Sequence, residues 1–243
     1  MLNSRFINDQ MGILQGNDAG EVITVSGSKF LNNGNPNIAR FGHAIYINTA
    51  ESLTVDSSEF CGQLIGHDVK SRAAATTVRN SVMYEGALDP NIPTCRAGTA
   101  SFSIDAPNGG LVTLTGDKLF QGPLSQNARM VDYGEEGLIF ANNAFTISNT
   151  LFSSTKGSTI GIYDPRCVPV RLTGDTFIGV ATQVSPAGCA VSSLASIQTL
   201  VAAADLAADP AAVPEPGSLL ILGAALIILR MLKRPNGRGT AAS

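Results

Sequence analysis

The sequence predicts an all-β fold in which the chain winds into stacked coils of short strands, and three observations support this prediction. One strand pattern recurs along the chain, apolar and polar residues alternate within each copy, and no copy has the spacing of an amphipathic helix. A single coil cannot bury its own apolar face, so the coils must stack, about 4.8 Å apart.

The first strand set defines the repeat. Each copy alternates at period two and then has a small polar residue and a large apolar residue, as expected for a strand, a corner and an inward anchor. The copies cover residues 23–30, 53–60, 76–83, 112–119, 145–152 and 170–177. With a partial copy near the start, the small polar position is held by Ser4, Ser28, Ser58, Ser81, Asp117, Thr150 and Asp175.

A second strand set lies between these copies, over residues 43–48, 67–72, 103–106, 130–133 and 161–164. A repeat of 23 or more residues has room for three short strands per coil. An antiparallel sandwich fits worse, because similar strands recur at one period instead of pairing across tight hairpins.

Together the two sets resemble the right-handed parallel β-helix repeat proteins of the pectate-lyase-like class. Residues 66–73, 104–110 and 134–137 resemble blocks of a bacterial β-helix family with no settled activity, and the likeness covers roughly residues 1–185. It implies a right-handed parallel β-helix over residues 1–190. We expect this domain to be truncated at its N-terminal end, because residues 2–6 already read like the middle of a repeat and no secretory signal precedes them.

The second strand set predicts a charged column. If Ile45, Val69, Ile104, Val131 and Ile162 point inward, the outward column is Tyr46, Lys70, Asp105, Asp132 and Tyr163, with Asn48 and Arg72 beside it. These residues are candidates for binding a glycan, with the tyrosines stacking on sugar rings. Lys70, Asp105 and Asp132 are also catalytic candidates, as a carboxylate pair for glycoside hydrolysis or as a base with cationic stabilisation in a lyase. A charge ladder that only keeps an exposed sheet soluble is the third interpretation.

The first strand set predicts a threonine column that could match ice. Its outward residues are Thr24, Thr54, Thr77, Thr113, Thr146 and Arg171, followed by Ser26, Asp56, Arg79, Thr115, Ser148 and Thr173. Asp56, Arg79 and Arg171 interrupt a flat, weakly hydrated surface, and threonine favours exposed strands in any case. Ice binding is therefore a minor alternative.

The histidines and cysteines suggest structural roles. His43 and His67 share the parity of inward residues, so we expect a half-buried stack at a coil corner in preference to a general base. Four cysteines allow three pairings; Cys61 with Cys95 and Cys167 with Cys189 is the local choice, and free buried thiols are the alternative. There is no CxxC spacing, so we expect no metal, and nothing indicates a cofactor.

The composition suits one globular domain with a tail. The chain has 243 residues, of which 44% are hydrophobic and 14% charged. With 16 Lys and Arg against 19 Asp and Glu, it lacks the basic excess that neutralises phosphates, so we expect no nucleic-acid partner.

The carboxyl end predicts a sorting tail. An Ala-rich linker, 191–212, leads into a segment, 213–235, with Val213, Pro214, Glu215 and Pro216, an apolar run, and then basic residues; 236–243 is expected to be a disordered basic end. The membrane residues would include Gly217, Leu219, Leu229, Arg230, Lys233 and Arg234. From Gly217 to Leu229 a helix is about 20 Å long, short of the roughly 30 Å apolar core of a bilayer, so snorkelling arginine and lysine would have to extend it.

This three-part order resembles the PEP-CTERM sorting signal of Gram-negative bacteria, also catalogued as an ice-binding protein C-terminal segment. The resemblance implies recognition by an exosortase and association with extracellular polysaccharide, although Arg230 interrupts the apolar run. We therefore expect an exported protein of the cell envelope, anchored transiently or stably by its tail, that binds or organises polysaccharide. A polysaccharide lyase, glycoside hydrolase or epimerase is the alternative.

Overall fold

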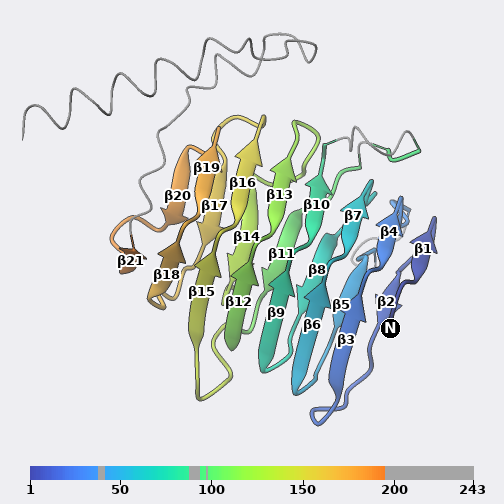
Figure 1. Cartoon of the computed structure of the whole chain (residues 1–243), viewed down its shortest axis with the longest axis horizontal. Coiled ribbons are helices and arrows are strands. Elements are labelled where there is room, and N and C mark those ends of the chain that lie inside the picture. The colour runs from blue at the N-terminus through green and yellow to red at the C-terminus, as the bar shows by residue number, and fades with distance from the viewer. Residues whose placement is uncertain (38–41, 88–93, 97, 195–243) are drawn as a thin grey trace, which may run out of the picture. The chain divides into compact units, whose positions relative to one another are not determined.

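The computed structural model describes residues 1–37, 42–87, 94–96 and 98–194. The secondary-structure elements in this part of the chain are all β-strands, and they form three parallel sheets of seven strands each (Figure 1). We call the three sheets A, B and C, in the order in which the chain visits them within a coil. Each coil adds one strand to every sheet. The predicted all-β solenoid of three-stranded coils is confirmed, and the architecture is consistent with a parallel β-helix.

Sheet A has the register that the period-two pattern predicts. Val25 pairs with Val55, and the inward column continues through Val78 and Leu114 to Ile147. All five side chains have no exposed surface, so they line the core. The strands of sheet A are β3 (Val22–Ser26), β6 (Ser52–Asp56), β9 (Ala75–Arg79), β12 (Leu111–Thr115), β15 (Ala144–Ser148), β18 (Val170–Thr173) and β21 (Val191–Leu194).

Six strands of sheet A, from β3 to β18, each lead into a strand of sheet B through a two-residue corner. Its strands are β1 (Arg5–Ile7), β4 (Lys29–Leu31), β7 (Glu59–Cys61), β10 (Val82–Glu85), β13 (Lys118–Gln121), β16 (Leu151–Ser154) and β19 (Thr176–Ile178). The anchor position faces the core in every coil, and the phenylalanines that occupy it form two separate stacks. Phe6, Phe30 and Phe60 stack with ring centroids 4.7 Å apart, as do Phe152 and Phe177. Met83 and Leu119 fill the same position in the two coils between them.

Sheet C contains the second strand set. Its strands are β2 (Ile13–Leu14), β5 (Ile45–Ile47), β8 (His67–Ser71), β11 (Phe102–Ala106), β14 (Arg129–Tyr133), β17 (Ile160–Tyr163) and β20 (Thr182–Ser185). The predicted inward column is confirmed, since Ile45, Val69, Ile104, Val131 and Ile162 pair in register and are buried.

The corner between sheets A and B explains the small polar residues of the repeat. Its first residue has a positive φ in every coil, a conformation that favours glycine and asparagine: Asn3, Gly27, Ser57, Asn80, Gly116, Asn149 and Gly174. Its second residue is the aligned Ser, Thr or Asp, and in five coils the side chain at this position accepts a hydrogen bond from the backbone N–H of the equivalent residue in the preceding coil. Ser28 N–H donates to Ser58 Oγ at 3.1 Å, and Ser81 N–H donates to Asp117 Oδ1 at 2.8 Å. These hydrogen bonds tie successive coils together.

Both local disulfides are formed. Cys61 bonds to Cys95, and Cys167 bonds to Cys189. The first joins β7 to the segment between β10 and β11 of the next coil, and the second joins the segments that follow β17 and β20 in successive coils. β21 lies inside the range expected to be linker and pairs with β18, so the solenoid extends to at least Leu194. The remaining linker, the sorting motif, the membrane segment and the basic end lie outside the described residues. Within the residues that the structure does describe, no helix is long and apolar enough to span a membrane.

Candidate functional site on the outer face of sheet C

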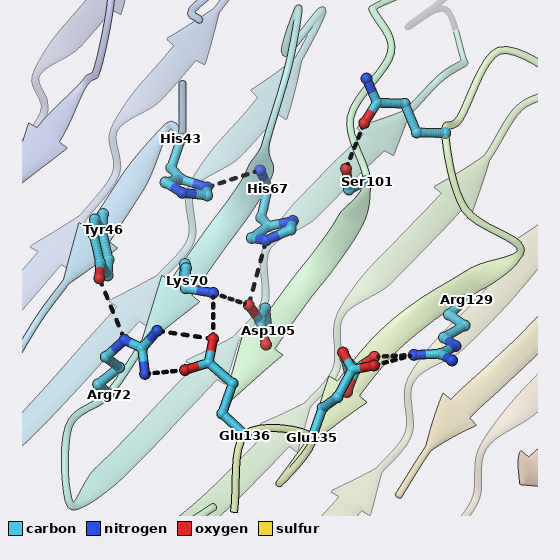
Figure 2. Close-up of polar contacts among 12 residues, drawn as sticks. His43, Tyr46, His67, Lys70, Arg72, Ser101, Asp105, Arg129, Glu135 and Glu136 are labelled. Atoms are coloured by element: carbon cyan, nitrogen blue, oxygen red, sulfur yellow. Dashed lines mark hydrogen bonds and ion pairs between the residues drawn. The ribbon is translucent and has the colours of Figure 1, made fainter. Parts of the chain in front are cut away.

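The outward column of sheet C is formed as the sequence predicts. Tyr46, Lys70, Asp105, Asp132 and Tyr163 pair in register on five successive strands, β5, β8, β11, β14 and β17. The sequence therefore places these five residues correctly next to one another, and Arg72, which follows β8, lies beside Tyr46 and Lys70 (Figure 2).

The two histidines lie on this outer face, contrary to the inward parity expected for them. Ala44 and Ile45 both belong to the core, so two consecutive residues point inward at the start of the strand, and His43 before them points outward. His67 does the same in the next coil, and its Nε2 lies 3.3 Å from Asp105 Oδ2 (Figure 2). The period-two rule fails here because it assumes a regular strand from its first residue.

The expected histidine stack is nevertheless present. The ring centroids of His43 and His67 are 4.7 Å apart, and the ring of Phe102 continues the stack at 4.7 Å. The backbone N–H of His67 donates to Nδ1 of His43 at 3.0 Å, which requires that nitrogen to be unprotonated. Burial, with the charges of Lys70 and Arg72, lowers the pKa of His43 to about 4. Burial also lowers the pKa of His67 well below its usual value, so both rings are neutral at pH 7.

Asp105 lies between a histidine and a lysine. Its Oδ2 accepts from Lys70 Nζ at 2.7 Å and lies close to His67 Nε2. Only 4% of its side chain is exposed, and burial raises its pKa to about 6 in spite of the nearby Lys70. A carboxyl group with this pKa changes protonation in the range that suits acid–base chemistry.

Arg72 anchors a second cluster next to Asp105. Its Nη2 donates to Oε1 of Glu136 at 2.8 Å, and its Nη1 lies 2.6 Å from Oε2 of the same carboxylate. Nε donates to the Tyr46 hydroxyl at 3.3 Å, and Nη1 also donates to Asn108 Oδ1 at 2.6 Å. Lys70 Nζ reaches Glu136 Oε1 at 3.5 Å, which links the two clusters.

Arg129 covers the end of the column that is formed by Asp132 and Tyr163. Its Nη1 contacts Asp132 Oδ2 at 2.8 Å and Glu135 Oε1 at 3.1 Å, and its guanidinium carbon lies 3.5 Å from the ring centroid of Tyr163. The Asp132 side chain has no exposed surface, and burial raises its pKa. Its other oxygen, Oδ1, has no hydrogen-bond partner among the described residues.

The expectation of an exposed charged column is therefore wrong for its two carboxylates. Asp105 and Asp132 are buried because other side chains lie on them: Lys70 and His67 contact Asp105, and Arg129 contacts Asp132. A substrate proton must come within hydrogen-bond reach of a general acid or base. The arrangement thus restricts access to both carboxylates and presents mainly Tyr46, Arg72 and the glutamates to solvent.

Sequence reasoning missed four residues of this site. Arg129 was missed because it lies one residue before the predicted strand, 130–133, that contributes Asp132 to the column. Glu135 and Glu136 belong to the turn after β14, and Asn108 belongs to the turn after β11, where no periodicity assigns a direction to a side chain. The sequence signal for the glutamates is the acidic pair flanked by Gly134 and Gly137, within the segment 134–137 that resembles a block of a β-helix family.

The remaining sequence candidates are structural or lie elsewhere. The threonine column is in register on sheet A from Thr24 to Thr146, and Arg79 beside it forms an ion pair with Asp56 at 2.9 Å. No group of three or more His, Cys, Asp or Glu side chains in the described part of the chain is arranged to hold a metal ion. The sorting and membrane residues from Val213 to Arg234 lie outside the described residues.

The fold and the site define a parallel solenoid with a charged and aromatic outer face. No known protein family, no curated protein and no solved structure matches the chain.

Proposed function

We propose that this chain is an exported surface protein of a Gram-negative bacterium whose right-handed β-helix, of the pectate-lyase-like class, binds extracellular polysaccharide without chemically changing it. An exosortase would recognise the PEP-CTERM tail at Val213 to Pro216, and the apolar segment after it would hold the protein in the membrane. The residue pattern of the tail supports export, and the outer face of sheet C supports glycan binding.

The observation that carries the binding proposal is the arrangement of the outer face of sheet C. Tyr46 offers a ring for stacking on sugars and Arg72 is a planar donor beside it, while Arg129 already covers one face of the Tyr163 ring at the other end of the column. These residues extend over five coils, and a binding site spread along a solenoid suits a long polymer. The buried and ion-paired carboxylates Asp105 and Asp132 support binding over hydrolysis or elimination, because neither is free to reach a substrate.

A polysaccharide lyase, hydrolase or epimerase is the alternative, favoured by the raised pKa of Asp105. Full-length protein should be tested on immobilised acidic and neutral polysaccharides, with retention and new reducing or unsaturated ends measured together. Because Asp105 holds Lys70 in position, we expect Asp105→Asn to weaken retention modestly, by about 1 kcal/mol, with no product formed by either protein. The matched control is Asp56→Asn on sheet A, which should leave retention unchanged.

Two outcomes would contradict this proposal. Product formation that falls about 100-fold in Asp105→Asn while retention persists would identify an enzyme. Unchanged retention in Asp105→Asn, Lys70→Ala and Tyr46→Ala alike would show that the outer face of sheet C is only a solvated surface.

Ice binding is not our proposal. The five threonines in register favour it, but the Asp56–Arg79 ion pair lies in the adjacent column and keeps that surface strongly hydrated.

A further inference from the structure

The two cations at the centre of sheet C hold a carboxylate that comes from a turn. Glu136 follows β14 by three residues, yet its side chain reaches back two coils to Lys70 on β8 and to Arg72 just after it (Figure 2). Arg72 meets both carboxylate oxygens, Oε2 at 2.6 Å and Oε1 at 2.8 Å. Two-point contact with a planar guanidinium is the geometry in which proteins recognise carboxylate, sulfate and phosphate groups.

The cations do not depend on Glu136 for their positions. Arg72 is held from its other sides by the Tyr46 hydroxyl and by Asn108 Oδ1. Lys70 is held by Asp105 Oδ2 at 2.7 Å. If the Glu136 side chain left, both cations would remain aimed at the same place, so the site is preorganised for an anionic group.

Glu136 is also the most displaceable member of the cluster. Its side chain is 46% exposed, against 12% for Lys70 and 21% for Arg72. Its backbone N–H donates to the carbonyl of Pro107 at 2.9 Å, so rotation of the side chain alone would vacate the site while the turn stays in place. Rotation of a partly exposed side chain is a fast and inexpensive motion.

We propose that Lys70 and Arg72, oriented by Asp105, Tyr46 and Asn108, bind the oxyanion of an acidic glycan, and that Glu136 occupies this site in the ligand-free protein as an internal competitor. The oxyanion is a sugar carboxylate or a sulfate ester. The inference rests on the proposed polysaccharide binding and adds its ligand class. The ligand must displace Glu136. The apparent affinity of the protein for the ligand is therefore lowered in proportion to the fraction of molecules in which Glu136 occupies the site.

The test compares full-length wild type with Glu136→Gln, which keeps the shape of the side chain and removes its charge. The probes are sodium glucuronate for the carboxylate, glucose 6-sulfate for the sulfate ester, and glucose as the neutral control. Binding is measured by titration while the Arg72 side-chain Nε–Hε signal is followed by NMR. We expect Glu136→Gln to bind at least one anionic probe about tenfold more tightly than wild type, with glucose causing no change in either protein.

Two further variants make the test specific. Glu135→Gln is the matched control, since Glu135 pairs with Arg129, and it should bind like wild type. Arg72→Lys in the Glu136→Gln background keeps the charge but removes the planar fork, and it should lose most of the gain. Circular dichroism confirms that each variant is folded.

Several outcomes would overturn the inference. The first is that wild type and Glu136→Gln bind both anionic probes with equal affinity. The second is that Glu135→Gln gains as much affinity as Glu136→Gln, and the third is that Arg72→Lys in the Glu136→Gln background keeps the full gain. Retention of wild type on polysaccharide that none of these variants changes would refute the oxyanion site and leave the proposed function standing. Tight glucuronate binding by Glu136→Gln without retention on any polysaccharide would support the site and refute the proposed function.

Discussion

At the scale of single residues, the start of each strand in sheet C decides which groups are inside. Two consecutive inward residues there place Asp68 in the interior together with Val69, in a fully buried position. Neither carboxylate oxygen of Asp68 has a hydrogen-bond partner among the described residues. Burial raises the pKa of Asp68 to about 8. Burial also raises the pKa of the nearby Glu85, although Ser103, Gln121 and Ser125 donate hydrogen bonds to its carboxylate.

This buried acid predicts a pH dependence of stability. The unfolded pKa of aspartate is about 3.9, so folding at pH values above it requires Asp68 to take up a proton. Its contribution is fully present below about pH 4 and is lost as the pH rises to about 8, at about 1.4 kcal/mol per pH unit. We expect Asp68→Asn to be more stable than wild type at pH 9 and to flatten this dependence, measured by urea unfolding at pH 5, 7 and 9. The exposed Asp18→Asn is the control; an Asp68→Asn protein with the same slope as wild type would show that Asp68 is ionised in the folded state.

At the scale of strands and turns, the stacking of equivalent residues holds the coils together. Phe60 is fully buried, lies on Phe30 at a centroid distance of 4.7 Å, and pairs in register with Met83 on its other side. Removing its ring leaves a cavity with neighbours above and below. We expect Phe60→Ala to lower the free energy of unfolding by about 3 to 5 kcal/mol, measured by urea denaturation.

The control for this prediction is Phe120→Ala. Phe120 lies in β13 but is only partly buried, stacked on Tyr84 outside the main core, so its removal should cost clearly less. A loss below about 0.5 kcal/mol in Phe60→Ala would mean that the anchor position does not carry the core.

The same scale shows how far the sequence predicts this fold. The inward columns from Val25 to Leu172 and from Ile45 to Ile162 could be predicted because a pleated strand alternates its side chains with an exact period, and stacking makes the same position recur. The corner could be predicted from its Ser, Thr and Asp residues, which accept backbone hydrogen bonds. The outward turn of His43 and His67 could not, because it depends on an irregular strand start.

The candidate site was predictable only in part for a related reason. Tyr46, Lys70, Asp105, Asp132 and Tyr163 follow from the register of the strands. Glu136 reaches Lys70 and Arg72 from a turn two coils away, and its direction depends on how that turn folds back over β11. Asp105 is buried by Lys70 and His67, and Asp132 is buried by Arg129. The alternation of the strands does not predict these contacts.

At the scale of the whole molecule, two features would act together in the proposed function. The solenoid offers a surface of repeated, register-matched side chains that can follow a polymer over several coils. The tail, from Val213 onward, would deliver that surface to the outside of the cell. Since the tail lies outside the described residues, its role depends on its sequence pattern: two prolines that exclude a helix, an apolar run and a basic end.

Processing of this tail is the prediction at the largest scale. We expect an epitope tag placed after Ser243 to be absent from the surface-released protein when the chain, with a secretory leader, is expressed in a host that has an exosortase. An internal tag in the solenoid should be retained, and mass spectrometry of the released form should place its new carboxyl terminus near Pro214 to Pro216. The matched control changes Pro214 and Pro216 to Ala, which should leave the carboxyl-terminal tag attached because the recognition motif is lost and the apolar helix can then extend through it. Retention of the tag on surface-released protein that keeps both prolines would show that the segment is not a processed sorting signal.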